Sequence, residues 1–352
     1  MLKMLRDRIQ MARGHKKSGG ILIYGHRGVG KTSLINKIIS EIIGPEDCPS
    51  DILVISRRLA RTTNDQELYN LLNEELTQQI EKRKGYIDRI KSIAKNVDSI
   101  SAFSLGIEVN RNNSEKTSYH RWKTYIENLT NVGLILIAID DADWLSMEAI
   151  GELKTIVEEV SKTPVLLTIS GFIDFEENLV DKYSPVARIF SGANFNIGKF
   201  TQEETKEVLT KPLVSERTLW DERAITAVHR ITSGYPYLVQ CLASASYVEN
   251  QTITEKRVKE SIKSAISIGQ SWLDHEVPDA SDQDVVSFAK IAKLDKNIVQ
   301  SAEISKAGVS PPYVGRLVRL KILKKLRRGR YSIEKSPMTA TFELLKRELS
   351  TE

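Results

Sequence analysis

Residues 25–33, which read Gly-His-Arg-Gly-Val-Gly-Lys-Thr-Ser, have the composition of a loop that binds phosphate groups. The apolar residues 21–24 precede this loop and a helical pattern of Leu and Ile follows it, so it joins a predicted strand to a predicted helix. Glycines let the backbone turn tightly, so that the N–H groups around Gly28, Val29 and Gly30 point at the phosphates. The N-terminus of the helix adds a partial positive charge. The sequence therefore predicts a nucleotide-binding site.

Three side chains at the end of the loop have chemistry that suits a nucleoside triphosphate. Lys31 is expected to reach the β- and γ-phosphates, and the Thr32 hydroxyl is expected to ligate Mg²⁺. Ser33 is placed to donate to the α-phosphate. Gly25, at the start of the pattern, is included among the nucleotide-binding residues. The expected ligands are ATP and Mg²⁺.

A second element of the site follows the apolar run 134–139. This run ends in Asp140, at the carboxyl end of a predicted buried strand, and ligands bind at that edge of a parallel sheet. We expect Asp140 to contribute to the Mg²⁺ shell and Asp141 to polarise the attacking water. Asp143 is an alternative for the second role. The other interpretation is an acidic turn that closes a core strand. The presence of Lys31 in the upstream loop favours a nucleotide site over such a turn.

A third apolar run over 165–169 ends in small polar residues. A hydroxyl from Thr168 or Ser170, on a strand next to the one that carries Asp140, would sense the γ-phosphate. The alternative is that these hydroxyls only close a core strand.

Arg188 lies some 18 residues after this run, in the segment 183–190. It is a candidate to stabilise transition-state charge on the nucleotide of a neighbouring subunit, which predicts a homo-oligomer. The alternative is a surface arginine on an amphipathic helix.

The chain is long enough for two or three domains. Strand and helix patterns alternate up to about residue 200, which predicts an α/β fold with a parallel sheet. The pattern then becomes purely helical, and an acidic stretch near 278–284 has the composition of a linker. The expected domains are an α/β core (1–200), a helical lid (201–277) and a C-terminal unit (278–352). Among the expected elements are helices over 66–95, 254–268 and 297–307 and an extended segment over 101–109.

The C-terminal unit is unusually basic. Helical patterns over 284–293, 297–307 and 311–322 precede a basic turn and a short strand over 331–333, which predicts a winged helix-turn-helix. Residues 311–333 contain eight cations and no acid, the pattern expected of a surface that meets a phosphate backbone. The eight are Arg316, Arg319, Lys321, Lys324, Lys325, Arg327, Arg328 and Arg330.

Double-stranded DNA is the partner that this pattern favours. Helix 311–320 would lie in the major groove with Tyr313 and Arg316 facing outward, and Gly329 would let Arg328 and Arg330 approach the backbone. Arg319, Lys324, Lys325 and Arg327 complete the expected contacts. Winged helices also bind proteins, so a protein partner is the alternative.

Composition limits the remaining possibilities. The two cysteines, Cys48 and Cys241, predict neither a disulfide framework nor a cysteine metal site. No apolar run approaches the length of a membrane span, and the N-terminal residues are charged, which predicts a cytoplasmic protein with no membrane partner.

The chain resembles the AAA+-related P-loop ATPases of the origin-recognition-complex and signalling (STAND) types, and among them the single-chain ATPases that end in a winged helix. The residues that carry this likeness are 25–33, 136–141, 167–171, 187–190, 200–204 and 232–238. The resemblance implies a core of the additional-strand type. It also implies that Gly234 and Pro236, at the start of a lid helix, contact the nucleotide. Asp141 stands where such ATPases usually carry glutamate, and its shorter side chain predicts slow turnover.

The expected function is that of an ATP-dependent, DNA-binding ATPase similar to initiators, loaders or transposition regulators. Lys31, Asp141 and Arg188 are its predicted catalytic residues. The alternative is a nucleotide-dependent signalling switch with a protein-binding winged helix and little turnover. A metabolic kinase is disfavoured, because nothing in the sequence resembles a site for an acceptor substrate.

Overall fold

The computed structural model describes residues 1–43, 51–61, 63–82, 118–129, 132–182, 184–213, 217–294 and 296–349. The chain divides into two compact units, 1–197 and 198–352. The further division of the second unit into a lid and a winged helix stays a prediction. The extended segment predicted over 101–109, and the part of the predicted helix 66–95 beyond residue 82, lie outside the described residues.

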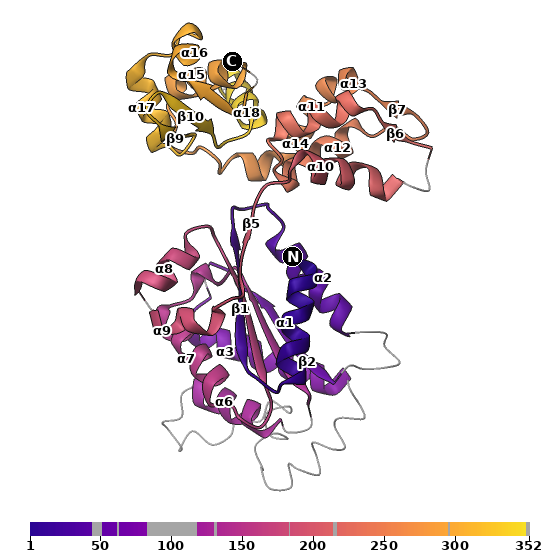
Figure 1. Cartoon of the computed structure of the whole chain (residues 1–352), viewed down its shortest axis with the longest axis vertical. Helices are drawn as coiled ribbons and strands as arrows, with labels where there is room; N and C mark the ends of the chain where they lie inside the picture. The colour runs from indigo at the N-terminus through magenta and orange to yellow at the C-terminus, as the bar shows by residue number, and fades with distance from the viewer. Residues whose placement is uncertain are drawn as a thin grey trace. The chain divides into compact units, whose positions relative to one another are not determined.

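A five-stranded parallel sheet forms the centre of the first unit (Figure 1). Its strands are β1 (Gly19–Gly25), β2 (Ile52–Arg58), β3 (Leu134–Asp140), β4 (Val165–Gly171) and β5 (Asn194–Ile197). Their order is β2-β3-β4-β1-β5, so β4 lies between the strand of the glycine-rich loop and the strand that ends in Asp140. This is the additional-strand arrangement, and the predicted α/β fold with a parallel sheet is confirmed.

Helices cover both faces of this sheet, as Figure 1 shows. They are α1 (Leu2–Gly14), α2 (Lys31–Ile43), α3 (Asp65–Lys82), α6 (Ser118–Asn128), α7 (Met147–Glu159), α8 (Phe175–Lys182) and α9 (Ser184–Ala187), with the 3₁₀ turns η1 (Ala142–Trp144) and η2 (Arg188–Phe190). Along β3, Ile135 and Ile137 pack with α3, α6, α7 and α8, while Leu136 and Ala138 pack with α1 and α2 on the other face. Because both faces are buried, polar groups can meet only at the strand ends.

The predicted lid forms the first part of the second unit. Its elements are α10 (Gln202–Thr210), η3 (Lys211–Leu213), β6 (Leu219–Trp220), α11 (Glu222–Thr232), α12 (Pro236–Ser246), β7 (Thr252–Ile253), α13 (Glu255–Glu260) and α14 (Ile262–Leu273). The single helix predicted over 254–268 is wrong, because the helix ends at Ser261 and a new one begins there. Thr254 caps the first of these two helices through its hydroxyl.

Residues 278–349, called here the C-terminal module, complete the second unit. Their elements are α15 (Asp282–Ala292), β8 (Ile298–Gln300), α16 (Ser301–Lys306), α17 (Pro311–Arg319), β9 (Leu323–Arg327), β10 (Arg330–Ile333) and α18 (Pro337–Leu349). The helix predicted over 297–307 is wrong at its start, where β8 pairs with β10 and buries Val299. A two-residue turn joins β9 to β10, and its Gly329 has a φ of 72°, which favours glycine.

Helix α18, which the sequence analysis did not predict, contributes to both hydrophobic cores of the second unit. Met338 and Phe342 pack into the core of the predicted lid. Ala340 and Leu344 pack into the core that also contains Phe288 of α15. The lid segment and the C-terminal module therefore share one helix. Within the described residues, no helix has the length and apolar character that a bilayer crossing requires.

Candidate nucleotide-binding site

The glycine-rich loop connects β1 to α2 as predicted, and the structure shows why its glycines are needed. Gly28 and Gly30 have φ angles of 77° and 100°, which strain any residue that carries a Cβ. A Cβ at Gly25 would lie 2.3 Å from the carbonyl oxygen of Ile197 on the neighbouring strand β5. Val29, between Gly28 and Gly30, is buried. The loop backbone is therefore held in a shape suited to an anion.

Lys31, the first residue of α2, is folded back over this loop. Its Nζ atom donates to the carbonyl oxygens of Gly25 at 2.9 Å and His26 at 3.1 Å, and it lies 5.3 Å from the centre of the Phe172 ring. The side chain is 6% exposed. Burial lowers its pKa, although the carboxylates of Asp141, Asp143 and Asp140 oppose this shift. The next two residues, Thr32 and Ser33, lie in the first turn of α2, and Ser33 is exposed.

Thr32, Asp140 and Ser170 form one hydrogen-bonded group at the carboxyl ends of β3 and β4. The Thr32 hydroxyl donates to Asp140 Oδ2 at 2.5 Å, and the Ser170 hydroxyl donates to Asp140 Oδ1. Asp140 is 5% exposed. Three elements far apart in sequence thus place hard oxygen atoms at one point, and oxygen is the ligand that Mg²⁺ prefers.

The remaining Mg²⁺ ligands would have to come from elsewhere. Among the described residues, no group of three or more His, Cys, Asp or Glu side chains is placed to hold a metal ion. Mg²⁺ commonly binds one or two protein oxygens and takes the rest from phosphates and water. Thr32 and Asp140 fit that pattern.

Asp141 follows directly in a left-handed conformation, with a φ of 57°. Its backbone N–H donates to Ser170 Oγ at 3.2 Å. Its carboxylate accepts a hydrogen bond from Arg58 Nε at 2.8 Å, while the same Nε atom lies 3.9 Å from Asp140 Oδ2. The predicted catalytic carboxylate is therefore adjacent to the Thr32–Asp140–Ser170 group and paired with a cation.

Arg58 is the site residue that the sequence analysis missed. It is the last residue of β2 and its side chain is 67% exposed. Strand β2 pairs with β3 so that Arg58 lies opposite Asp140. The available signal was the apolar run 52–55, which is followed closely by Arg57 and Arg58, but the side chain could be placed only once β2 was known to neighbour β3.

Asp143 has a structural role in this arrangement. Both of its carboxylate oxygens accept the backbone N–H of Phe172, at 2.8 and 3.0 Å. Burial raises its pKa. The bond fixes the segment after β4, whose Phe172 ring lies over Lys31. Asp141 is accordingly the better candidate for contact with water.

Two predicted residues of the first unit lie apart from this group. Thr168 is buried within β4, opposite Ala138 and Ile21, so it lies two residues or about 7 Å before Ser170. Arg188 is exposed in η2, where the next two residues pack beside Gly20 at the amino end of β1. It therefore lies at the sheet edge opposite the glycine-rich loop. Its action on the nucleotide of a neighbouring subunit stays a prediction.

Gly234 and Pro236 occur at the start of α12 as expected. Gly234 has a φ of 70°, and an added Cβ would lie 2.3 Å from the carbonyl oxygen of Phe200. Pro236 occupies the first turn of α12. Both belong to the second unit, and their contact with nucleotide stays a prediction.

The predicted DNA-contacting residues differ in their surroundings. Lys324, Lys325, Arg327 and Arg328 are exposed on β9 and its turn, and Arg319 is exposed on α17. Tyr313, expected to face outward, packs partly buried against the core. Arg316 is tied to Asp284 by two hydrogen bonds of 2.8 and 2.7 Å. Arg330 is half-buried on β10.

Comparisons with known proteins agree with this geometry. Residues 14–177 match the family model described as an AAA domain. The fold is similar to that of Cdc6p from Pyrobaculum aerophilum (14% identity, TM-score 0.50), with 99% of this chain and 94% of that chain covered. It is also similar to the Aeropyrum pernix ORC2 protein in its ADPNP–ADP complexes (12% identity, TM-score 0.57, 99% and 94% covered). A third similar structure is a Walker-type ATPase of Pyrococcus abyssi (13% identity, TM-score 0.51, 95% and 93% covered). No curated protein sequence matches the chain.

Proposed function

We propose that this protein is an ATP-dependent, DNA-binding ATPase, because residues 14–177 match the family model of an AAA domain and the fold is similar to those of the Cdc6p and ORC2 structures. The observation that carries the proposal is the meeting of the Thr32, Asp140 and Ser170 side chains beside the glycine-rich loop. ATP would bind with its phosphates against the backbone N–H groups of residues 28–31. The cytoplasmic location expected from the sequence stays part of this proposal.

Each group of the site has a task with bound ATP. Lys31 exchanges its two loop carbonyls for phosphate oxygens, which are stronger partners for an ammonium group. Thr32 and Asp140 would hold Mg²⁺, whose positive charge would offset the negative charge of the phosphates. Asp141 accepts a hydrogen bond from the attacking water, and Ser170 contacts the γ-phosphate. Arg58 holds the Asp141 carboxylate, which restrains it and favours slow turnover.

Replacing Asp141 with asparagine is expected to lower the rate of ATP hydrolysis by about 100-fold or more, because a positioned carboxylate base contributes on that scale. Affinity for ATP should change little, since Asp141 contacts water and not the phosphates. Single-turnover hydrolysis and equilibrium binding of a fluorescent ATP analogue measure the two quantities. Asp7→Asn, an exposed change on α1, is the control. Wild-type hydrolysis by Asp141→Asn would remove Asp141 from the mechanism.

DNA is proposed as the partner of the C-terminal module. The order of its elements, a helix, a strand, two helices and a hairpin, is that of a winged helix, and α18 is added after the hairpin. The hairpin carries five of the eight cations that the sequence places between residues 311 and 333. Such a surface releases counterions when it meets a phosphate backbone, which makes binding favourable and dependent on salt.

Arg188 is proposed to act on the ATP of a second copy of the chain, so that assembly depends on nucleotide.

Contacts of Tyr235 offer a route by which nucleotide bound at the predicted lid would affect the C-terminal module. Tyr235, between Gly234 and Pro236, donates from its hydroxyl to the carbonyl oxygen of Glu334 at 2.9 Å. Lys199 donates to the same oxygen at 2.7 Å and lies 4.4 Å from the centre of the Tyr235 ring. Glu334 directly follows the hairpin strand β10. A shift of the Gly234–Pro236 segment would therefore be passed to the base of the hairpin.

Tyr235→Phe is expected to reduce the effect of ATP on DNA affinity, because it removes the hydroxyl but keeps the ring against Lys199 and Trp272. The lost hydrogen bond should cost about 1 kcal/mol of stability, and ATP affinity should remain within about twofold. The measurement is the ratio of DNA dissociation constants with and without a non-hydrolysable ATP analogue. Tyr237→Phe, whose ring also packs on Trp272, is the matched control. An unchanged ratio in Tyr235→Phe would contradict this coupling.

The second candidate function is a signalling switch that binds a protein through its C-terminal module and scarcely hydrolyses ATP. The pairing of Asp141 with Arg58 favours it, since it engages the predicted catalytic carboxylate. Salt-dependent binding of duplex DNA would support the first candidate, and its absence would support the second.

A further inference from the structure

In the proposed winged helix, α17 is the helix that would face the DNA bases, yet few of its exposed side chains can form hydrogen bonds with them. Its exposed residues are Pro311, Pro312, Gly315, Arg316 and Arg319. Proline and glycine side chains have no hydrogen-bond donor or acceptor. Base-specific contact in the major groove depends on such groups, above all on Arg, Lys, Asn and Gln. Only the two arginines are of this kind.

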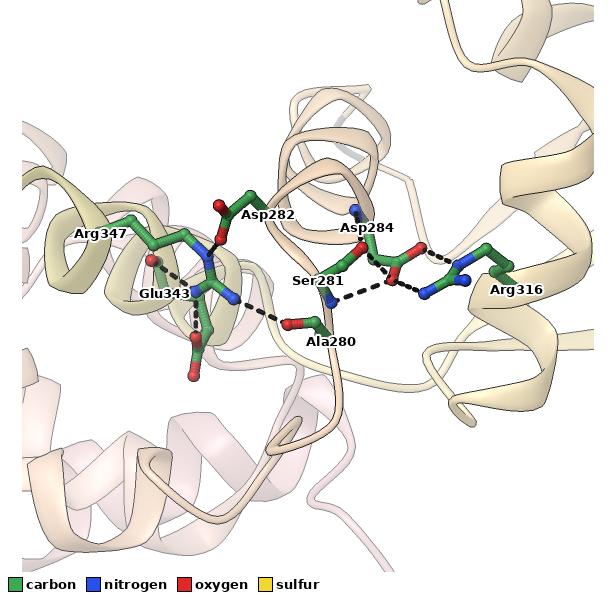
Figure 2. Close-up of polar contacts among 7 residues, drawn as sticks. All are labelled: Ala280, Ser281, Asp282, Asp284, Arg316, Glu343 and Arg347. Atoms are coloured by element: carbon green, nitrogen blue, oxygen red, sulfur yellow. Dashed lines mark hydrogen bonds and ion pairs between the residues drawn. The ribbon is translucent and has the colours of Figure 1, made fainter.

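The first of these arginines is engaged within the protein. Arg316 makes a bidentate contact with the Asp284 carboxylate (Figure 2). Its Nε and Nη2 atoms donate to the two oxygens at 2.8 and 2.7 Å. The Asp284 side chain is fully buried and also accepts from the backbone N–H and hydroxyl of Ser281. Hydrogen bonds from Arg316 lower the pKa of Asp284 to about 2. Turning Arg316 toward a base would leave this buried carboxylate unpaired, which is costly.

A second arginine fixes the other side of the N-terminus of α15, the helix that carries Asp284. Figure 2 shows Arg347 of α18 bonded to Asp282, Glu343 and the carbonyl oxygen of Ala280. The N-terminus of α15 is thus held from both sides. Asp284 cannot easily move to follow Arg316 outward. Arg319 is therefore the one exposed arginine of α17 that the fold does not hold, and Tyr313 is partly buried against the core.

The hairpin has the opposite character. Lys324, Lys325, Arg327 and Arg328 are exposed, and Arg330 is half-buried. Within the described residues, none of these five side chains makes an ion pair. Exposed cations without a partner suit phosphates, whose positions do not depend on base sequence.

We propose that the C-terminal module binds duplex DNA through its hairpin by phosphate contacts and does not read base sequence. This inference rests on the proposed DNA binding and adds that duplexes of any sequence bind. Arg316 has a structural role as the partner of Asp284. The hairpin cations supply the affinity.

The test uses the full chain with Mg²⁺, a non-hydrolysable ATP analogue and a pool of 20-base-pair duplexes of random sequence. Bound and free duplexes are separated and sequenced. We expect binding with no enriched motif. An enriched motif of three or more base pairs would overturn this inference and leave the proposed function intact. Failure to bind any duplex would overturn both.

Variants separate the roles of the cations. Each alanine substitution at Lys324, Arg327 or Arg328 should reduce the slope of log affinity against log salt by about 0.9, because one phosphate contact is lost. Arg319→Ala should change this slope by about 0.9 or less and leave the melting temperature unchanged. Arg316→Ala should lower the melting temperature, which calorimetry measures. Wild-type melting of Arg316→Ala together with weaker DNA binding would place its guanidinium on DNA and contradict the inference.

Discussion

Lys31→Ala is expected to lower ATP affinity by at least about 100-fold and to remove measurable hydrolysis. The side chain is buried beside the loop, where a single ammonium group meets the phosphates with little competition from water. Lys31 also holds the loop by bonding Gly25 and His26, so its loss affects both the charge and the shape of the site. Isothermal titration with ATP and a steady-state phosphate assay measure these effects.

Lys37→Ala is the matched control for this change. Lys37 lies on the same helix α2, but its side chain is 60% exposed and pairs with Glu41. It should bind and hydrolyse ATP as the wild type does, because an exposed helix ion pair contributes little. Lys31→Ala with wild-type ATP affinity would show that the glycine-rich loop is not the nucleotide site.

Reversing four hairpin charges, with Lys324, Arg327, Arg328 and Arg330 all changed to Glu, is expected to weaken duplex binding by about 1,000-fold or more at moderate salt. Each cation that leaves the interface loses one counterion-release contribution, and each new carboxylate is repelled by phosphate. Fluorescence anisotropy with a labelled duplex over a salt series measures both the affinity and its slope.

A control variant makes the same change in net charge outside the C-terminal module, at Lys3, Lys37, Lys162 and Lys256, which are all exposed. It should weaken binding only slightly, through the long-range field. Equal losses in the two variants would show that net charge, and not the hairpin, controls DNA affinity.

The nucleotide site was predictable where it depends on local pattern and on one rule of sheet geometry. The glycine-rich loop, Thr32 and Asp140 follow from apolar runs that end in the residue types phosphate chemistry needs. Ser170 was expected near them because the carboxyl ends of parallel strands share one edge, and its bond to Asp140 agrees with that reasoning.

The rest of the site depends on contacts that sequence spacing does not encode. Arg58 reaches Asp141 only because β2 is the neighbour of β3, and strand order cannot be read from one sequence. Asp143 was an alternative to Asp141 until its hydrogen bonds to the backbone N–H of Phe172 were known. The short strand β8 was taken for helix because its three residues form a strand through pairing with β10.

The C-terminal module shows a similar limit. Counting cations predicted a basic surface, and exposed lysines and arginines lie on the hairpin. The same count grouped Arg316 with them, although its partner Asp284 precedes it by 32 residues and is buried. Net charge therefore located the surface, while tertiary packing determined which cations remain available to a ligand.

ATP bound by the first unit is proposed to control the affinity of the C-terminal module for DNA. The most direct test is the dissociation constant for a labelled duplex with and without a non-hydrolysable ATP analogue and Mg²⁺, in the wild type and in Lys31→Ala. We predict that nucleotide changes the affinity of the wild type by about fivefold or more and leaves that of the variant unchanged. The same affinity in the wild type under both conditions would contradict the claim.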